Sequence, residues 1–139
     1  MATFFLLVII GAISGFILGL VMKIVRIVTG NEGEILLYNM DYIPVLKRWA
    51  DKSITGLIFH YMTCIVSAVV LFYMLVPLGF ERDIWPYVLV YSAGGGVLFF
   101  LSILTPTPPS HKDTAAWINW TVSHAIFGVS VGLLIYLWI

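Results

Sequence analysis

Four long segments without Asp, Glu, Lys or Arg constrain the fold of this chain more than any other feature. They cover residues 1–22, 54–80, 84–110 and 114–139 of a 139-residue sequence. A helix of about 20 predominantly apolar residues crosses the roughly 30 Å core of a bilayer, and each segment is longer than that. Charged residues make up only 10% of the chain, against about 25% in soluble domains. Too few polar side chains are left to surround a soluble core.

We therefore predict an all-α, polytopic membrane protein with one domain, a bundle of four transmembrane helices. The spans are expected at about residues 3–25, 54–76, 85–104 and 115–138, with ends set in part by prolines, which cannot continue a helical hydrogen-bond ladder. Residues 26–53 form a longer polar loop, and we expect its apolar parts, 35–38 and 42–46, to lie in the headgroup layer. The first span is expected to be retained, because its basic residues follow it, the reverse of a signal peptide.

Basic residues are concentrated on the side of the membrane that carries the first and third loops. By the positive-inside rule, this side is expected to be cytoplasmic. The net charge of zero gives no reason to expect a nucleic-acid partner. The basic residues on the predicted cytoplasmic side are Lys23, Arg26, Lys47, Arg48, Lys52 and Lys112, against Arg82 alone on the other.

Two histidines, His60 and His124, lie inside predicted spans. An ionisable side chain in hydrocarbon is costly, so an intramembrane histidine indicates a functional site. At 1.5 Å per residue, His60 lies roughly 9 Å and His124 roughly 13 Å from the same boundary. We predict a shared ligand or proton site. Cys64 lies one turn after His60, and Lys23 and His111 are placed near the same boundary as further members of the site.

Simpler interpretations remain open at this point. Each histidine can hydrogen-bond a carbonyl of a neighbouring helix, and Lys23 can extend to the headgroups from the end of its span. The segment that ends in His111 contains Pro106, Pro108 and Pro109, which is also typical of a helix stop and tight linker. Cys64 is the single cysteine, so no intramolecular disulfide is expected.

Small residues recur every fourth position in the first and last spans, a spacing that lets membrane helices approach closely. We predict packing within the bundle, with a homo-oligomer through these glycine faces as the alternative. Gly94-Gly95-Gly96 in the third span predicts a close backbone approach or a weak point in that helix. Trp117 and Trp120 fit an interfacial aromatic belt. The packing glycines are Gly11, Gly15, Gly19, Gly128 and Gly132.

The leading functional hypothesis is a histidine-lined pocket or conduit for protons or a small solute. One alternative is a b-type haem protein, in which His60 and His124 supply both axial ligands. A metal site that adds Cys64 is chemically allowed, but we predict no metal and no resident cofactor. The last alternative is a non-catalytic accessory subunit that docks a partner through its glycine faces. No enzyme is expected, because Asp and Glu occur only in the loops and no nucleophile–base motif is present.

Short motifs are spread over the chain: Gly15, Gly19 and Lys23, then His60, then Thr107-Pro108-Pro109, then His124 with Phe127-Gly128. Together they resemble the YagU-like family of small bacterial inner-membrane proteins. The sequence departs from that family's pattern after Lys23, where an aromatic-acidic and Pro-Pro-Arg stretch is absent. The resemblance implies a multi-pass protein of the bacterial inner membrane and an association with survival under acid stress, for which histidines are suited as proton sensors.

Overall fold

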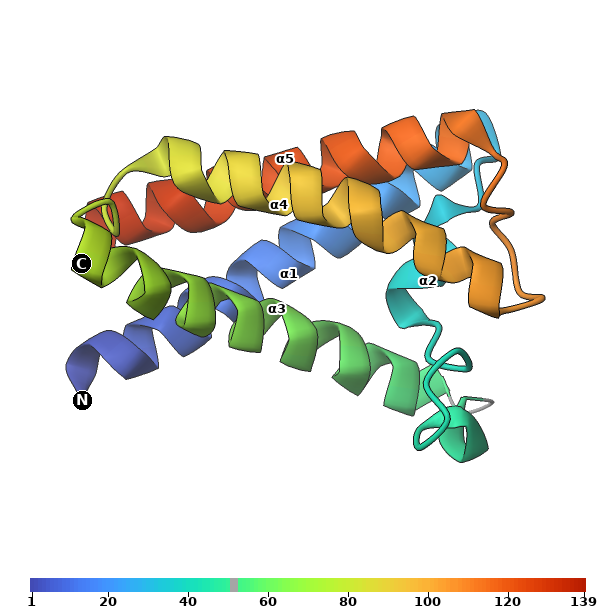
Figure 1. Cartoon of the computed structure of the whole chain (residues 1–139), viewed down its shortest axis with the longest axis horizontal. Helices are drawn as coiled ribbons and strands as arrows, with labels where there is room; N and C mark the ends of the chain where they lie inside the picture. Colours follow the sequence, from blue (N-terminus) through green and yellow to red (C-terminus); the bar gives the residue numbers. More distant parts are fainter. Residues whose placement is uncertain (51–52) are drawn as a thin grey trace.

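A computed structural model of the chain describes residues 1–50 and 53–139 (Figure 1). Within them, four helices are long and apolar enough to cross a membrane, and this confirms the predicted all-α membrane bundle. They are built on α1 (Ala2–Thr29), α3 (Ser53–Leu75), α4 (Ile84–Leu98) and α5 (Thr114–Trp138), and the second and third spans continue through 3-10 segments to Leu78 and Leu104. A short helix, α2 (Gly33–Tyr38), and three 3-10 segments, η1 (Lys47–Trp49), η2 (Val76–Leu78) and η3 (Phe99–Leu104), complete the structure.

The ends of the helices follow from local sequence. Gly30 ends α1 in the left-handed conformation (φ 71°), and its N–H donates to the carbonyl of Arg26 at 2.8 Å. Gly79 does the same after η2, with φ 73°, because glycine adopts this conformation without a Cβ penalty. The carboxylate of Asp113 accepts the N–H of Ala116 at 2.9 Å and so caps the start of α5.

The four spans pack in the spatial order α3, α1, α5, α4. The closely packed pairs are α1 with α3, α1 with α5, and α4 with α5. Figure 1 shows α3 and α4 joined by a short turn at the end that holds both termini and diverging toward the other end. The helix α2 lies between their diverging ends. The helices α3 and α4 are not among the closely packed pairs.

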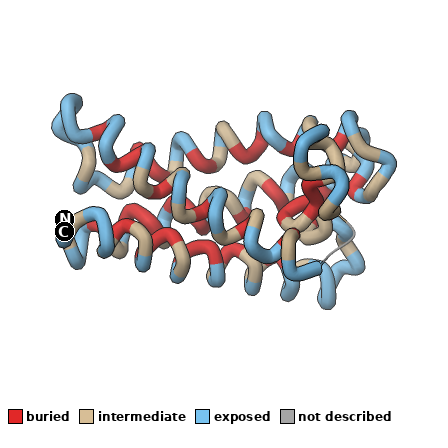
Figure 2. The backbone as a smooth tube through the Cα atoms, turned by 90° about the horizontal axis from the view of Figure 1, so that it is seen from below, coloured by how far each residue is buried: buried red, intermediate tan, exposed pale blue. Residues whose placement is uncertain are grey.

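Buried residues follow the inner face of each span and exposed residues its outer face (Figure 2). The exposed residues are largely apolar, as expected of a surface in contact with lipid. Among them are Ile9, Phe16, Val66, Leu89 and Val129.

The five predicted packing glycines all lie against other segments of this same chain. A Cβ at Gly11 would stand 2.6 Å from the Cα of Ile65 on α3, and one at Gly128 would stand 2.6 Å from the carbonyl oxygen of Tyr87 on α4. Contacts this short leave no room for a side chain, so these helices cross backbone against backbone. The remaining three meet Cys64 (Gly15), Tyr38 and His60 (Gly19), and Ile84 (Gly132).

The first loop differs from the expected interfacial segment. Leu36 and Leu37 of α2 are buried, as is Met40, which is 1% exposed. The helix α2 contacts α1, α3 and α5, because the divergence of α3 and α4 leaves apolar surface that it can cover. Val45, at 71% exposure, is one apolar residue of this loop that stays at the surface.

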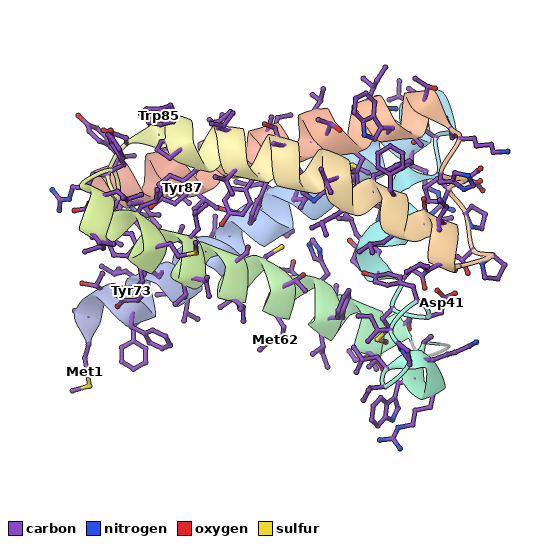
Figure 3. All side chains as sticks on the ribbon, in the orientation of Figure 1. Met1, Asp41, Met62, Tyr73, Trp85 and Tyr87 are labelled. Atoms are coloured by element: carbon purple, nitrogen blue, oxygen red, sulfur yellow. The ribbon has the colours of Figure 1, made fainter. Side chains whose placement is uncertain are left out.

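A hydrogen-bonded cluster holds this loop to the end of η3. The carboxylate of Asp41 accepts the hydroxyls of Thr105 and Thr107, each at 2.8 Å. The side-chain amide of Asn39 donates to the Thr105 hydroxyl at 3.3 Å. Figure 3 shows Asp41 at the end of the bundle opposite the two termini, here called the wide end, close to the last turns of the ribbon that forms α4 and η3. These hydrogen bonds therefore hold loop one against the segment that follows η3.

Candidate functional site

The space between α3 and α4 contains a cavity of about 340 Å³. The helices α1 and α5 also contribute lining residues, and so does α2 at the wide end of the bundle. The lining contains no Asp, Glu, Lys or Arg and is mostly apolar. The lining residues are Leu18, Leu36, Leu37, Tyr42, Phe59, His60, Thr63, Cys64, Ser67, Val90, Tyr91, Gly94, Gly95, Leu98, Leu101, Trp120, His124 and Phe127.

His60 lines this cavity and is only 3% exposed. Its Nε2 lies 2.9 Å from the carbonyl oxygen of Gly15 on α1. A carbonyl can only accept, so Nε2 carries the hydrogen and Nδ1 is the acceptor of the neutral ring. The sulfur of Cys64 lies 3.9 Å from Nδ1. The ring of Tyr38 meets the imidazole edge-on, with centroids 5.3 Å apart.

His124 lines the same cavity from α5. Its Nδ1 donates to the carbonyl of Trp120, one turn earlier, at 2.8 Å. The neutral ring therefore keeps Nε2 as an acceptor. The imidazole packs on the indole of Trp120, with centroids 4.4 Å apart. A Cβ at Gly95 would lie 2.6 Å from Cγ of His124, so the ring fits against α4 only because residue 95 is glycine.

The glycine triplet of α4 receives two indole hydrogen bonds from α5. Trp120 donates from Nε1 to the carbonyl of Gly95 at 2.8 Å, and Trp117 donates to that of Gly96 at 3.0 Å. Shortly afterwards, at Phe99, α4 passes into the 3-10 segment η3. The expected close approach is found at Gly95 and Gly96, whereas the helix runs unbroken through the triplet. Trp120 is 6% exposed, so the prediction of an interfacial belt is wrong for this residue.

Tyr91 on α4 also lines the cavity, and the sequence did not single it out. It is 9% exposed and packs edge-on against Phe127, with centroids 4.6 Å apart. Its hydroxyl is buried and makes no hydrogen bond of 3.5 Å or less among residues 1–50 and 53–139, but the hydroxyl of Ser67 on α3 is close enough to serve as its acceptor. The neighbouring hydroxyl of Ser67 donates instead to the carbonyl of Cys64 at 3.0 Å. The available signal was spacing, since Tyr91 lies four residues before Gly95 and hence on the same face.

The structure brings His60, Cys64 and His124 to one cavity but places the other two predicted site residues elsewhere. Lys23 is exposed and is not part of the lining. Four residues turn a helix by roughly 400°, so the stripe that starts at Gly11 rotates steadily away from α3 before it reaches Lys23. His111 lines a second cavity, of about 480 Å³, beside the proline-rich segment 105–110.

The geometry gives no ready metal or haem ligand set. Across the described part of the chain, no group of three or more His, Cys, Asp and Glu side chains is placed to hold a metal. Haem ligation through Nε2 of His60 would first require its hydrogen bond to Gly15 to break. No family model, curated protein or solved structure matches this chain. A functional assignment therefore rests on the cavity itself.

Proposed function

We propose that this protein binds a small, mostly apolar molecule in the cavity between α3 and α4, within the bacterial inner membrane. The observation that carries the proposal is one cavity of about 340 Å³ that both intramembrane histidines line. Small-molecule sites have volumes of roughly 300–1,000 Å³, with apolar walls and a few polar groups that orient the ligand. The cavity fits this description.

Access to the cavity is lateral, from the lipid. Val90 and Leu98 line the cavity, yet they are 44% and 54% exposed on the outer surface of α4. A mouth between two membrane-spanning helices admits molecules that are already dissolved in the bilayer. The class of ligand is therefore lipid-soluble.

A pocket that is closed at one end of the bundle fits the packing better than a conduit across the membrane. At the end that holds both termini, the bundle is filled by Leu7, Ile135 and Tyr87, each 0% exposed. The hydroxyl of Tyr87 donates to the carbonyl of Glu81 at 2.7 Å (Figure 3). A proton path would also require both histidines to give up their hydrogen bonds to backbone carbonyls. We accordingly propose a binding protein with no catalytic role.

The resemblance to the YagU-like family supports a link to acid stress, which we include in the proposal. A protonated imidazole in a lining without acidic side chains would be an uncompensated charge in an apolar space, and this is costly. Acid would therefore empty or reshape the pocket. Replacing both histidines, as in His60→Phe with His124→Phe, should remove any acid-dependent phenotype of the protein. Unchanged survival of cells that carry the double variant at low pH would refute the link.

Filling the cavity tests the binding function directly. A Cβ at Gly94 meets no atom within 4 Å, so Gly94→Leu adds a side chain at the lining without a backbone clash. Ala93→Leu is the matched control, because Ala93 is exposed and does not line the cavity. Native mass spectrometry of the purified protein should show a bound molecule in the wild type and in Ala93→Leu, and none in Gly94→Leu. A wild type without any adduct, or a Gly94→Leu variant that retains it, contradicts the proposal.

A further inference from the structure

We propose that residues 44–50 bind the headgroup of an anionic phospholipid at the surface of the bilayer. This segment, called the basic elbow below, contains Lys47 and Arg48 of η1 and precedes the second span. None of its residues lines the cavity between α3 and α4. The lipid site is therefore separate from the proposed ligand site.

The basic elbow lies next to the start of a membrane span. The span begins at Ser53, and Ile54 and Ile58 near its start are exposed, as expected of side chains in contact with lipid. The turn η1 ends at Trp49, four residues before Ser53. Figure 1 shows this part of the chain beside the start of α3, at the wide end of the bundle. This position corresponds to the headgroup layer.

The two cations of the basic elbow form no ion pair. Lys47 and Arg48 are both exposed, and within the residues that the structure describes the only ion pair joins Arg26 to Glu34. Asp41 is close enough to attract Lys47, but two threonine hydroxyls already donate to its carboxylate. Two adjacent exposed cations favour an anionic partner, and one that lies in the headgroup layer is a phospholipid.

The guanidinium group of Arg48 is held by the neighbouring indole. Its Cζ lies 3.9 Å from the centroid of the Trp49 ring, a cation–π contact. A stacked guanidinium keeps N–H groups at its edge, and their geometry matches two phosphate oxygens. Trp49 and Val45, which is 71% exposed, supply apolar surface of the kind found at membrane interfaces. The basic elbow thus combines cationic and apolar side chains, as expected of a segment that binds in the headgroup layer.

The net charge of the lipid decides which headgroup is expected. Phosphatidylcholine and phosphatidylethanolamine carry a cation beside the phosphate, which cancels its charge and competes with Lys47 and Arg48. Phosphatidylglycerol carries the phosphate without a cation. Each basic residue close to an anionic membrane surface strengthens the attraction about fivefold. The preferred lipid is therefore of the phosphatidylglycerol type.

Native mass spectrometry of the purified protein in mild detergent tests this preference. The protein is titrated with dioleoyl phosphatidylglycerol and, separately, with dioleoyl phosphatidylcholine. We expect the wild type to bind the anionic lipid at least about fivefold more tightly. Glycerol 3-phosphate, which has the phosphate but no acyl chains, should not displace it. These measurements use the unaltered protein, so they do not depend on the folding of a variant.

Lys47→Gln combined with Arg48→Gln removes both charges and leaves Trp49 in place. We expect this double variant to bind phosphatidylglycerol roughly 5- to 30-fold less tightly and phosphatidylcholine as the wild type does. Lys23→Gln combined with Lys112→Gln is the matched control. Both lysines are exposed, one near the end of α1 and one just before α5, and the change in net charge is the same. The control should keep the affinity of the wild type for phosphatidylglycerol.

Three results would overturn the lipid site. Equal binding of the two lipids by the wild type would show that the charge of the headgroup is not recognised. Displacement of phosphatidylglycerol by glycerol 3-phosphate would identify a site for free phosphate esters. An equal loss of affinity in both double variants would assign the attraction to the overall charge of the protein and not to the basic elbow.

Discussion

His60 on α3 donates a hydrogen bond from Nε2 to the backbone carbonyl of Gly15 on α1, over 2.9 Å. The contact exists because Gly15 has no side chain to keep the two helices apart: a Cβ there would already stand 3.0 Å from Cβ of Cys64. One interaction thus fixes the tautomer of the histidine and the register of the α1–α3 pair. Its loss affects both stability and the site.

Replacing His60 with Phe should destabilise the folded protein by about 1 kcal/mol, the usual size of an interhelical hydrogen bond in a membrane. His60→Gln is the matched control, because its amide N–H reaches a similar position and should restore part of the loss. Equilibrium unfolding in mixed micelles measures both changes. Equal stability of the wild type and His60→Phe would show that the bond contributes nothing.

Gly11→Ala should destabilise the bundle by about 1–3 kcal/mol, the range for overpacking a close contact. The new methyl group would lie 2.6 Å from the Cα of Ile65, and a backbone atom cannot move aside without separating α1 from α3. Gly94→Ala serves as the control, since no atom lies within 4 Å of its Cβ. Thermal unfolding should rank Gly94→Ala close to the wild type and Gly11→Ala well below it. If Gly94→Ala were less stable than Gly11→Ala, the glycine-containing face of α1 would not pack against α3 as described.

Asp41 should make a pH-dependent contribution to stability. Burial alone would raise the pKa of its carboxyl, but hydrogen bonds from Thr105 and Thr107 outweigh this and hold the pKa below its ordinary value of 3.8. A depressed pKa in the folded state means that the stabilisation is present above pH 3.8 and is lost as the pH falls through the folded-state pKa. Asp41→Asn should therefore cost about 1 kcal/mol at pH 7 and less at a second pH well below 3.8.

The control for Asp41 is Asp83→Asn. Asp83 is exposed at the start of α4, and its side chain makes no cap hydrogen bond, so no comparable loss is expected. Thermal unfolding midpoints of the three proteins at the two pH values test the prediction. A deficit in Asp41→Asn that is the same at both pH values would rule out the ionised carboxylate as its origin.

Hydrophobicity and charge were sufficient to predict the four spans, because the bilayer imposes one length scale on each of them. They could not predict that α1 continues beyond the expected span, 3–25, to Thr29. Lys23 and Arg26 indicate where the apolar segment ends, but charged residues do not end a helix. The buried α2 was also missed. Whether a short apolar segment lies on the membrane or inside the bundle depends on the space left between α3 and α4, and this follows from tertiary packing.

The spacing of small residues placed His60 and Cys64 on a helix-packing face, and the structure puts both on the cavity with His124. The same spacing misplaced Lys23, because the rotation of a four-residue stripe accumulates over several turns. Tyr91 was missed although it lies four residues before Gly95, and Trp120 was assigned to the membrane interface. An aromatic residue near the end of a span resembles an interfacial anchor until the crossing of α4 and α5 shows which face is covered.

The turn at residues 79–83 joins α3 and α4 at the end of the bundle that holds both termini (Figure 1). At the opposite end, where Figure 3 shows Asp41, its carboxylate accepts the hydroxyl of Thr107 and so ties loop one to the segment that follows η3. The two helices are thus linked at both ends of the bundle. For the proposed ligand, the separation of α3 and α4 sets the largest cross-section that fits between them, and Asp41→Asn should admit bulkier molecules.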